Sequence, residues 1–142
     1  MNLETGVMYE KFVAGHSPEE RAAMDSALSV DPGTISYTVI ALDGDEPVGH
    51  SALRPVGSTG QELEVKKVYV APSARGTGVA KQLMAHLEEI ARASGVGTLV
   101  LQTGVLQVDA IALYEKIGYR PIAPFGAYAA IPGALCYEKT LR

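Results

Sequence analysis

The stretch of sequence that decides the fold is VYVAPSARGTGVA, residues 68–80. It begins as an apolar strand, passes through a turn containing Gly76 and Gly78, and runs directly into an amphipathic helix. Such a turn presents unpaired backbone N–H groups at a helix N-terminus, where the helix dipole adds about half a positive charge. Glycine lets the backbone approach a ligand closely, and Arg75 adds a fork of donors that suits phosphate. The junction therefore predicts a site for an anion.

Two nucleotide-binding motifs do not fit this junction. A dinucleotide fingerprint needs a third glycine where Lys81 stands, and a P-loop needs Gly-Lys-Ser/Thr after four intervening residues. Taken alone, the Arg-Gly-Thr-Gly segment is equally compatible with a phosphate cradle and with a simple strand–helix turn whose glycines serve only the geometry.

Hydrophobic periodicity around the junction predicts one α/β domain. Strands are expected at 7–13, 35–41, 48–53, 62–70, 98–101, from Tyr119 onward and at 135–140, with an Asp-Gly hairpin turn at 43–44. Helices are expected from the Ser17 cap to about Leu28, from Val79 to a glycine cap at Gly95, and over 109–117 before Gly118. This order implies a mixed sheet with helices on both faces.

Composition narrows the class of protein. The chain has 142 residues, and its net charge of 12 − 16 = −4 argues against a general nucleic-acid binder or a polybasic membrane-surface protein. A single cysteine, Cys136, allows no internal disulfide and no cysteine-rich zinc site, and is expected to be a small buried residue. His16, His50 and His86 lack metal-site spacing. We expect a cytoplasmic, metal-free protein without a membrane segment.

Two linked motifs carry a family resemblance. The pattern VYVxPxxRGxGVA, followed by an amphipathic helix and about thirty residues later by AIALYEKIGY at 110–119, resembles the GNAT superfamily of acetyl-CoA-dependent N-acetyltransferases. The resemblance covers roughly Gly49 to the C-terminus. It implies that residues 1–142 form one N-acetyltransferase domain with a mostly antiparallel central sheet, and that acetyl-CoA is the acyl donor.

The resemblance also implies a set of cofactor-binding residues. Val68 and Val70 of the strand would contact pantetheine. The turn and the start of the helix would bind the pyrophosphate through Arg75, Gly76, Thr77, Gly78, Val79 and Ala80. Gln107 stands where the family commonly has an asparagine that binds the pantetheine arm. Ser73 stands where the family usually has glutamine or arginine.

Tyr114 is the candidate general acid, because in Leu-Tyr-Glu-x-x-Gly-Phe/Tyr segments of the family this tyrosine lies near the sulfur of the cofactor. A phenol with a pKa of about 10 can protonate a thiolate whose conjugate acid has a pKa of about 8.5. The alternative is that Tyr114, between Leu113 and Ile117, is only a half-buried core residue.

A general base is needed because an alkyl amine with a pKa near about 10 is mostly protonated at neutral pH. Related sequences often carry an acid at the position of Glu64, which is therefore the first candidate, acting directly or through water. Glu62, two residues away on the same face of the strand, is the second. A solvated pair of acids without catalytic role is the alternative. The resemblance assigns stabilisation of the oxyanion to the backbone N–H of Val70.

Three residues are candidates for the acceptor site. Arg54, at a strand end, suits a substrate carboxylate, and Phe125 and Tyr128 lie in a PFGAY segment similar to the Phe-Gly-x-Tyr loop of a bacterial subgroup of the family. His50 is a further candidate to face the acceptor cleft.

The sequence thus predicts transfer of an acetyl group to a primary amine of a small molecule or peptide by direct attack, with no nucleic acid or membrane partner and possible homodimers. The acceptor itself is left open. The departures at Ser73 and Gln107 leave a second hypothesis, a non-catalytic acyl-CoA-binding or sensing domain.

Overall fold

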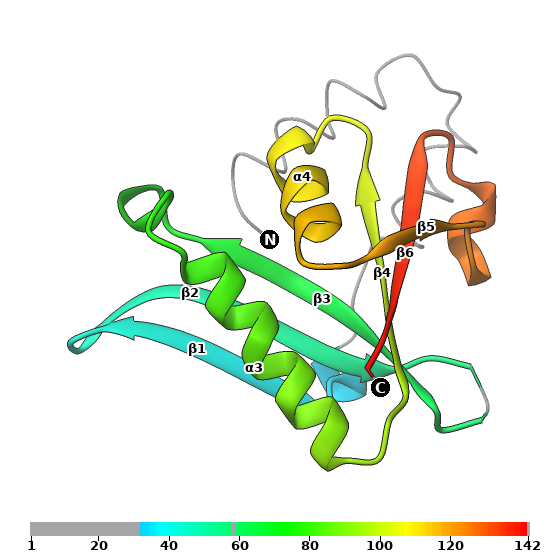
Figure 1. Cartoon of the computed structure of the whole chain (residues 1–142), viewed down its shortest axis with the longest axis horizontal. Coiled ribbons are helices and arrows are strands. Elements are labelled where there is room, and N and C mark those ends of the chain that lie inside the picture. The colour runs from blue at the N-terminus through cyan, green and yellow to red at the C-terminus, as the bar shows by residue number, and fades with distance from the viewer. Residues whose placement is uncertain (1–31, 58, 142) are drawn as a thin grey trace. The chain divides into compact units, whose positions relative to one another are not determined.

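The computed structural model of the chain describes residues 32–57 and 59–141 (Figure 1). The strand predicted at 7–13, the helix predicted at 17–28 and His16 lie outside these residues. The described residues form two compact units, one made of 32–101 with 138–141 and the other of 102–137. The prediction of a single domain over the whole chain stays a prediction.

The described residues build a six-stranded sheet in the order β1-β2-β3-β4-β6-β5. β1, β2 and β3 pair antiparallel, whereas β3 and β4 pair parallel. The predicted mixed, mostly antiparallel sheet is thereby confirmed. The strands are β1 (Tyr37–Asp43), β2 (Glu46–Pro55), β3 (Glu62–Val70), β4 (Thr98–Gly104), β5 (Arg120–Ile122) and β6 (Ala134–Thr140).

The helices of the described part are α3 (Val79–Ala93) and α4 (Val108–Lys116), with short 3-10 turns η1 (Pro32–Thr34), η2 (Pro72–Ala74) and η3 (Gly126–Ala130). None of these helices is long and apolar enough to cross a membrane. Helices on both faces of the sheet stay a prediction, because the helix predicted at 17–28 is not among the described residues.

α3 ends as its sequence predicts. Gly95 has φ 79°, its N–H donates to the Arg92 carbonyl (3.1 Å), and the Val96 N–H donates to the Ala91 carbonyl (3.0 Å). These two bonds form a Schellman cap, which satisfies carbonyls left open at the helix end.

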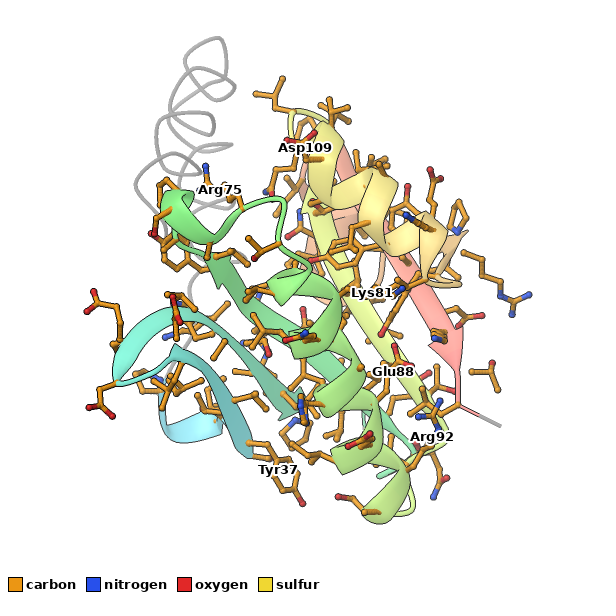
Figure 2. All side chains as sticks on the ribbon, turned by 60° about the vertical axis from the view of Figure 1, so that its left-hand side comes forward. Tyr37, Arg75, Lys81, Glu88, Arg92 and Asp109 are labelled. Carbon is orange, nitrogen blue, oxygen red and sulfur yellow. The ribbon has the colours of Figure 1, made fainter. Side chains whose placement is uncertain are left out.

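Ion pairs also hold the polar side of α3. Glu88 is 6% exposed, and its Oε1 lies 2.9 Å from Lys139 Nζ and 3.5 Å from Arg92 Nη2 (Figure 2).

α3 packs directly onto the backbone of β2 at Gly49. A Cβ atom at this position would lie 2.9 Å from the Tyr69 carbonyl oxygen, 3.1 Å from Leu83 Cδ1 and 3.2 Å from Val79 Cγ1. The first of these contacts is with main chain, which cannot move aside. A residue without a side chain is therefore required where the helix, β2 and β3 meet.

We expect Gly49→Ala to lower the free energy of unfolding by about 1–3 kcal/mol, because the added methyl overpacks this junction. Urea denaturation of the variant and the parent measures the loss. Gln82→Ala, on the exposed side of α3, is the control and should change the free energy by less than about 0.5 kcal/mol. An unchanged urea midpoint for Gly49→Ala would contradict the packing described here.

Candidate acyl-donor site

The turn between β3 and α3 places two glycines in the left-handed region, with φ 78° at Gly76 and 88° at Gly78. Gly78 is the N-cap of α3, and no side chain caps the helix there. The first intrahelical bond runs from the Gln82 N–H to the Gly78 carbonyl at 3.0 Å. The amides of residues 79–81 therefore precede the helical ladder, as an anion site at a helix N-terminus requires.

Hydrogen bonds within the turn hold this shape. The Thr77 hydroxyl donates to the Ala74 carbonyl, and Arg75 Nε donates to the Val70 carbonyl at 3.2 Å. A Cβ atom at Gly76 or Gly78 would meet no atom of the described residues within 4 Å. Both glycines are thus favoured by their backbone angles, and not by crowding from the described part of the chain.

The electrostatics of the turn favour an anion. Arg75 and Lys81 stand at its two ends, both exposed, and the first turn of α3 contains no acidic residue (Figure 2). Their charges add to the positive end of the helix dipole. The larger unit therefore carries a turn with exposed basic side chains, next to amides that precede the helical ladder.

The end of β3 offers a main-chain donor next to this turn. The Ala71 N–H donates to the Val48 carbonyl of β2 at 2.8 Å. Because successive amides of a strand point to opposite edges, the Val70 N–H points away from β2. The parallel ladder with β4 ends at the pair Val65–Leu101, so Val70 lies beyond it.

The two carboxylates considered as bases differ in their surroundings. Glu64 is 1% exposed, and its Oε1 lies 2.8 Å from Arg54 Nε and its Oε2 3.7 Å from Lys66 Nζ. Glu62, at the start of β3, is half-buried. The structure thus joins two predicted site residues, Arg54 and Glu64, in one buried ion pair, which the sequence reasoning did not foresee because cross-strand register is not visible locally.

Tyr114 belongs to the second unit and lies on α4. It is 6% exposed, and its ring centroid lies 5.9 Å from that of Tyr119. The Tyr119 N–H donates to the Tyr114 carbonyl at 2.9 Å, the Gly118 N–H donates to the Glu115 carbonyl at 3.2 Å, and Gly118 has φ 101°. The Gly-Tyr pair of the motif is therefore a Schellman cap whose apolar contact holds the ring of Tyr114.

The second unit contains another buried tyrosine, Tyr137. Burial raises the pKa of Tyr137 above its ordinary value, and the carboxylate of Glu115 raises this pKa further through its charge and a hydrogen bond. Tyr137 therefore keeps its proton at neutral pH.

The remaining predicted residues of the second unit lie at α4 and η3. Gln107 is the N-cap of α4 and accepts the Ile111 N–H at 3.0 Å through its carbonyl. Phe125 and Tyr128 stack edge to face at 5.2 Å, and Tyr128 packs in a small cluster that includes Cys136. Cys136 is a free, buried cysteine.

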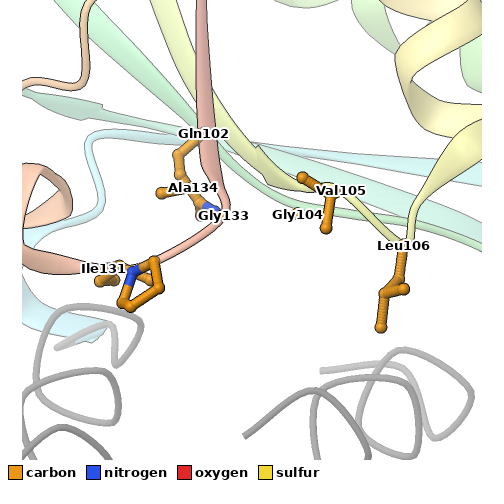
Figure 3. A pocket seen from close by; sticks show the side chains of 8 residues that line it. Gln102, Gly104, Val105, Leu106, Ile131, Gly133 and Ala134 are labelled. Atoms are coloured by element: carbon orange, nitrogen blue, oxygen red, sulfur yellow. The ribbon is translucent and has the colours of Figure 1, made fainter.

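The same unit carries a pocket of about 230 Å³ of empty volume, open to solvent (Figure 3). Among the described residues that line it, only Gln102 has a side chain with polar atoms; the others are Gly104, Val105, Leu106, Ile131, Pro132, Gly133 and Ala134. Neither Phe125 nor Tyr128 lines it. Local sequence did not predict this pocket. The strand was predicted to end at residue 101, whereas β4 continues through Gln102 and Thr103 as far as Gly104.

Histidines make no metal centre in the described part of the chain, where no group of three or more His, Cys, Asp or Glu side chains could hold an ion. His86 is exposed, and its Nδ1 lies 3.8 Å from Oε2 of Glu89. His50 lies on β2, half-buried, with its Nδ1 2.6 Å from the Lys67 carbonyl oxygen.

Comparison with known proteins identifies the class of this site. The profile of the acetyltransferase (GNAT) family matches residues 7–119, which include the whole glycine turn. The chain belongs to the GNAT family. Its resemblance to this family is thereby confirmed, whereas assignment to the Phe-Gly-x-Tyr subgroup stays a prediction.

Individual GNAT proteins agree with this assignment. The chain is 45% identical over 103 residues to an IAA acetyltransferase of Azospirillum brasilense, covering 72% of this chain and 67% of that protein. It spans about half of a second curated relative, an N-acetyltransferase of Escherichia coli strain K12 (52%). Among solved structures, an acyl-CoA N-acyltransferase of Klebsiella pneumoniae has 32% identity and a TM-score of 0.72, covering 87% of this chain and 88% of that one.

A more distant fold neighbour was solved with the cofactor. The PaiA N-acetyltransferase of Thermoplasma acidophilum, in complex with coenzyme A, has a TM-score of 0.64 at 18% identity and covers 86% of this chain and 67% of that one. At this identity the likeness concerns the fold.

We expect Gly78→Ala to raise the Kd for acetyl-CoA by about 5- to 30-fold, since a left-handed alanine costs about 1–2 kcal/mol and the turn would relax away from its ligand. Isothermal titration calorimetry measures the change. Gly95→Ala is the matched control, because Gly95 also has a left-handed φ (79°) and open space, but lies at the opposite end of α3. Equal effects of the two substitutions on Kd would contradict a ligand role for the turn.

Proposed function

We propose that this GNAT protein transfers the acetyl group of acetyl-CoA to a primary amine by direct attack of the amine on the thioester, without a covalent enzyme intermediate. The observation that carries the proposal is the open turn with Gly76 and Gly78, flanked by Arg75 and Lys81, at the N-terminus of α3. It fits the pyrophosphate of coenzyme A in charge and in the availability of amides.

Residues of β3 and of the turn would hold the donor. Val68 and Val70 would contact the pantetheine arm through the strand edge beyond the ladder with β4, and residues 75–80 would bind the phosphates. Gln107 would bind the pantetheine arm from the N-cap of α4. The Val70 N–H, which points away from β2, suits an oxyanion, because a fixed main-chain dipole needs no reorganisation when charge develops.

Tyr114 is the proposed general acid. Its ring is held by the cap at Gly118 and by Tyr119, which supplies the rigidity that positioned proton transfer requires. The amine attacks the thioester carbonyl, the amide forms, the C–S bond breaks, and the departing CoA thiolate would take the phenolic proton of Tyr114.

We expect Tyr114→Phe to lower kcat by about 10²- to 10⁴-fold while changing the Kd for acetyl-CoA less than about twofold, because only the transferred proton is lost. Release of CoA thiol under steady-state conditions reports kcat, and calorimetry reports Kd. Tyr119→Phe, which removes a hydroxyl from the neighbouring ring, is the control. A kcat that Tyr114→Phe leaves at the parental value would remove Tyr114 as the acid.

The base is proposed to be Glu64, with Glu62 or water as the alternatives. Glu64 is 1% exposed and in contact with Arg54 and Lys66, which leaves little room for an amine to approach it directly. We therefore propose that Glu64 acts through water. Arg54, Phe125 and Tyr128 stay the proposed residues of the acceptor site.

We expect Glu64→Gln to lower kcat/KM mainly at low pH, where the free amine is scarce, and by about 10²-fold or more. Above the pKa of the acceptor amine the variant should approach the parent, because the amine no longer needs a base. Activity as a function of pH, together with the same profile for Glu62→Gln, separates the two acids. A parallel profile for Glu64→Gln, combined with a lower melting temperature, would show that the ion pair is only structural.

The acceptor is proposed to be a primary amine of a small molecule or peptide. A panel of amino acids, polyamines, aminoglycosides and peptides with free N-termini, assayed for CoA release and product mass, tests the proposal. Acetylation of one class at a rate well above hydrolysis supports it. Tight acetyl-CoA binding without transfer to any amine would favour the second candidate, a non-catalytic acyl-CoA-binding domain. The departures from the family pattern at Ser73 and Gln107 support this candidate. Cytoplasmic localisation and homodimers stay predictions.

A further inference from the structure

β3 contains a bulge directly before the segment proposed to hold the acyl donor. Ala52 pairs with Lys66 and His50 pairs with Tyr69, so Ser51 alone faces two residues of β3, Lys67 and Val68. Lys67 has φ 56° and, among the described residues, is the one non-glycine with a positive φ. A lysine gains nothing from this conformation by itself, and such residues persist only where their surroundings impose them.

His50 is the group that holds this conformation. Its Nδ1 lies 2.6 Å from the carbonyl oxygen of Lys67. Because a carbonyl only accepts, the ring must carry its proton on Nδ1 and donate it. The ring also lies against Tyr69, with centroids 5.4 Å apart and planes inclined by 34°. The bond therefore joins β2 to the bulged peptide itself.

The bulge determines which way the following residues face. With one residue fewer, Val68 would oppose His50 and Tyr69 would oppose Gly49, and every side chain from Val68 to Val70 would move to the other face of the sheet. The main-chain groups would exchange edges in the same way. The Val70 N–H points away from β2, and the Val70 carbonyl accepts a hydrogen bond from Arg75 Nε. The directions of both groups thus depend on the extra residue at Lys67.

We propose that His50 is a positioning residue for acetyl transfer: its Nδ1–H bond to the Lys67 carbonyl holds the left-handed bulge that orients Val68–Val70 toward the acyl donor. The inference rests on the proposed function, since it assigns to His50 the alignment of the same strand segment. It gives this histidine a role through the main chain, whereas its position facing the acceptor cleft stays a prediction.

Three substitutions separate the hydrogen bond from the ring and from the backbone. His50→Phe keeps an aromatic ring beside Tyr69 and removes the donor. His50→Asn places an amide N–H close to the position of Nδ1. Lys67→Gly allows the left-handed backbone without support, and the lysine side chain that it removes is exposed.

We expect His50→Phe to raise the Kd for acetyl-CoA roughly three- to tenfold, the equivalent of one hydrogen bond, and to lower kcat as well. His50→Asn should stay within about twofold of the parent. The double variant His50→Phe/Lys67→Gly should recover the Kd of Lys67→Gly alone, since glycine holds the bulge unaided. His86→Phe on α3 is the control for losing a histidine.

Two-dimensional amide spectra of the same variants, recorded without ligand, read the bulge itself. The resonances of residues 67–70 should move in His50→Phe and return in the double variant. If the parent binds no acetyl-CoA, the proposed function fails, and spectra that still follow this pattern show that His50 controls the bulge. If the parent binds acetyl-CoA but His50→Phe changes neither Kd nor the spectra, or glycine at position 67 restores nothing, the inference is overturned.

Discussion

The close approach of α3 to the backbone of β2 is the constraint on which the rest of the larger unit depends. A single position without a side chain, Gly49, lets Val79 and Leu83 of the helix rest on β2 beside the Tyr69 carbonyl of β3. The first turn of α3 is thereby fixed against the strand end from which the chain enters it. This leaves only a short, left-handed turn to join β3 to the helix, and that turn exposes amides instead of burying them.

Charge is separated along the same strand. At one end of β3, Glu64 is buried with Arg54 and Lys66, so its negative charge is neutralised within the fold. Beyond the other end of β3, the exposed side chains of Arg75 and Lys81 lie near the positive end of the α3 dipole. Burying an ion pair is costly unless its members are well paired, and the bond of 2.8 Å between Arg54 and Glu64 meets this condition. An anionic donor therefore meets attraction at the turn and no opposing charge from Glu64.

Local sequence predicted much of this arrangement. β3 has the predicted bounds, α3 ends at its predicted glycine cap, and the left-handed angles of Gly76 and Gly78 follow from residue types that strongly favour them. What local sequence could not predict depends on pairing between strands. The bulge at Lys67 lies in a Lys-Lys-Val-Tyr run without a glycine, and it exists because His50 of another strand holds it. The pairing of Arg54 with Glu64 likewise requires the β2–β3 register.

The central claim is that the glycine turn binds the pyrophosphate of an acyl-CoA. Titration of acetyl-CoA into the purified protein in a calorimeter, with NAD as a comparison and with the Arg75→Glu variant, tests it most directly. The account predicts binding of acetyl-CoA in the micromolar range, no binding of NAD, and a loss of at least about tenfold in affinity when the charge of Arg75 is reversed. Absence of acetyl-CoA binding by the parent protein, or binding that is indifferent to Arg75→Glu, would contradict it.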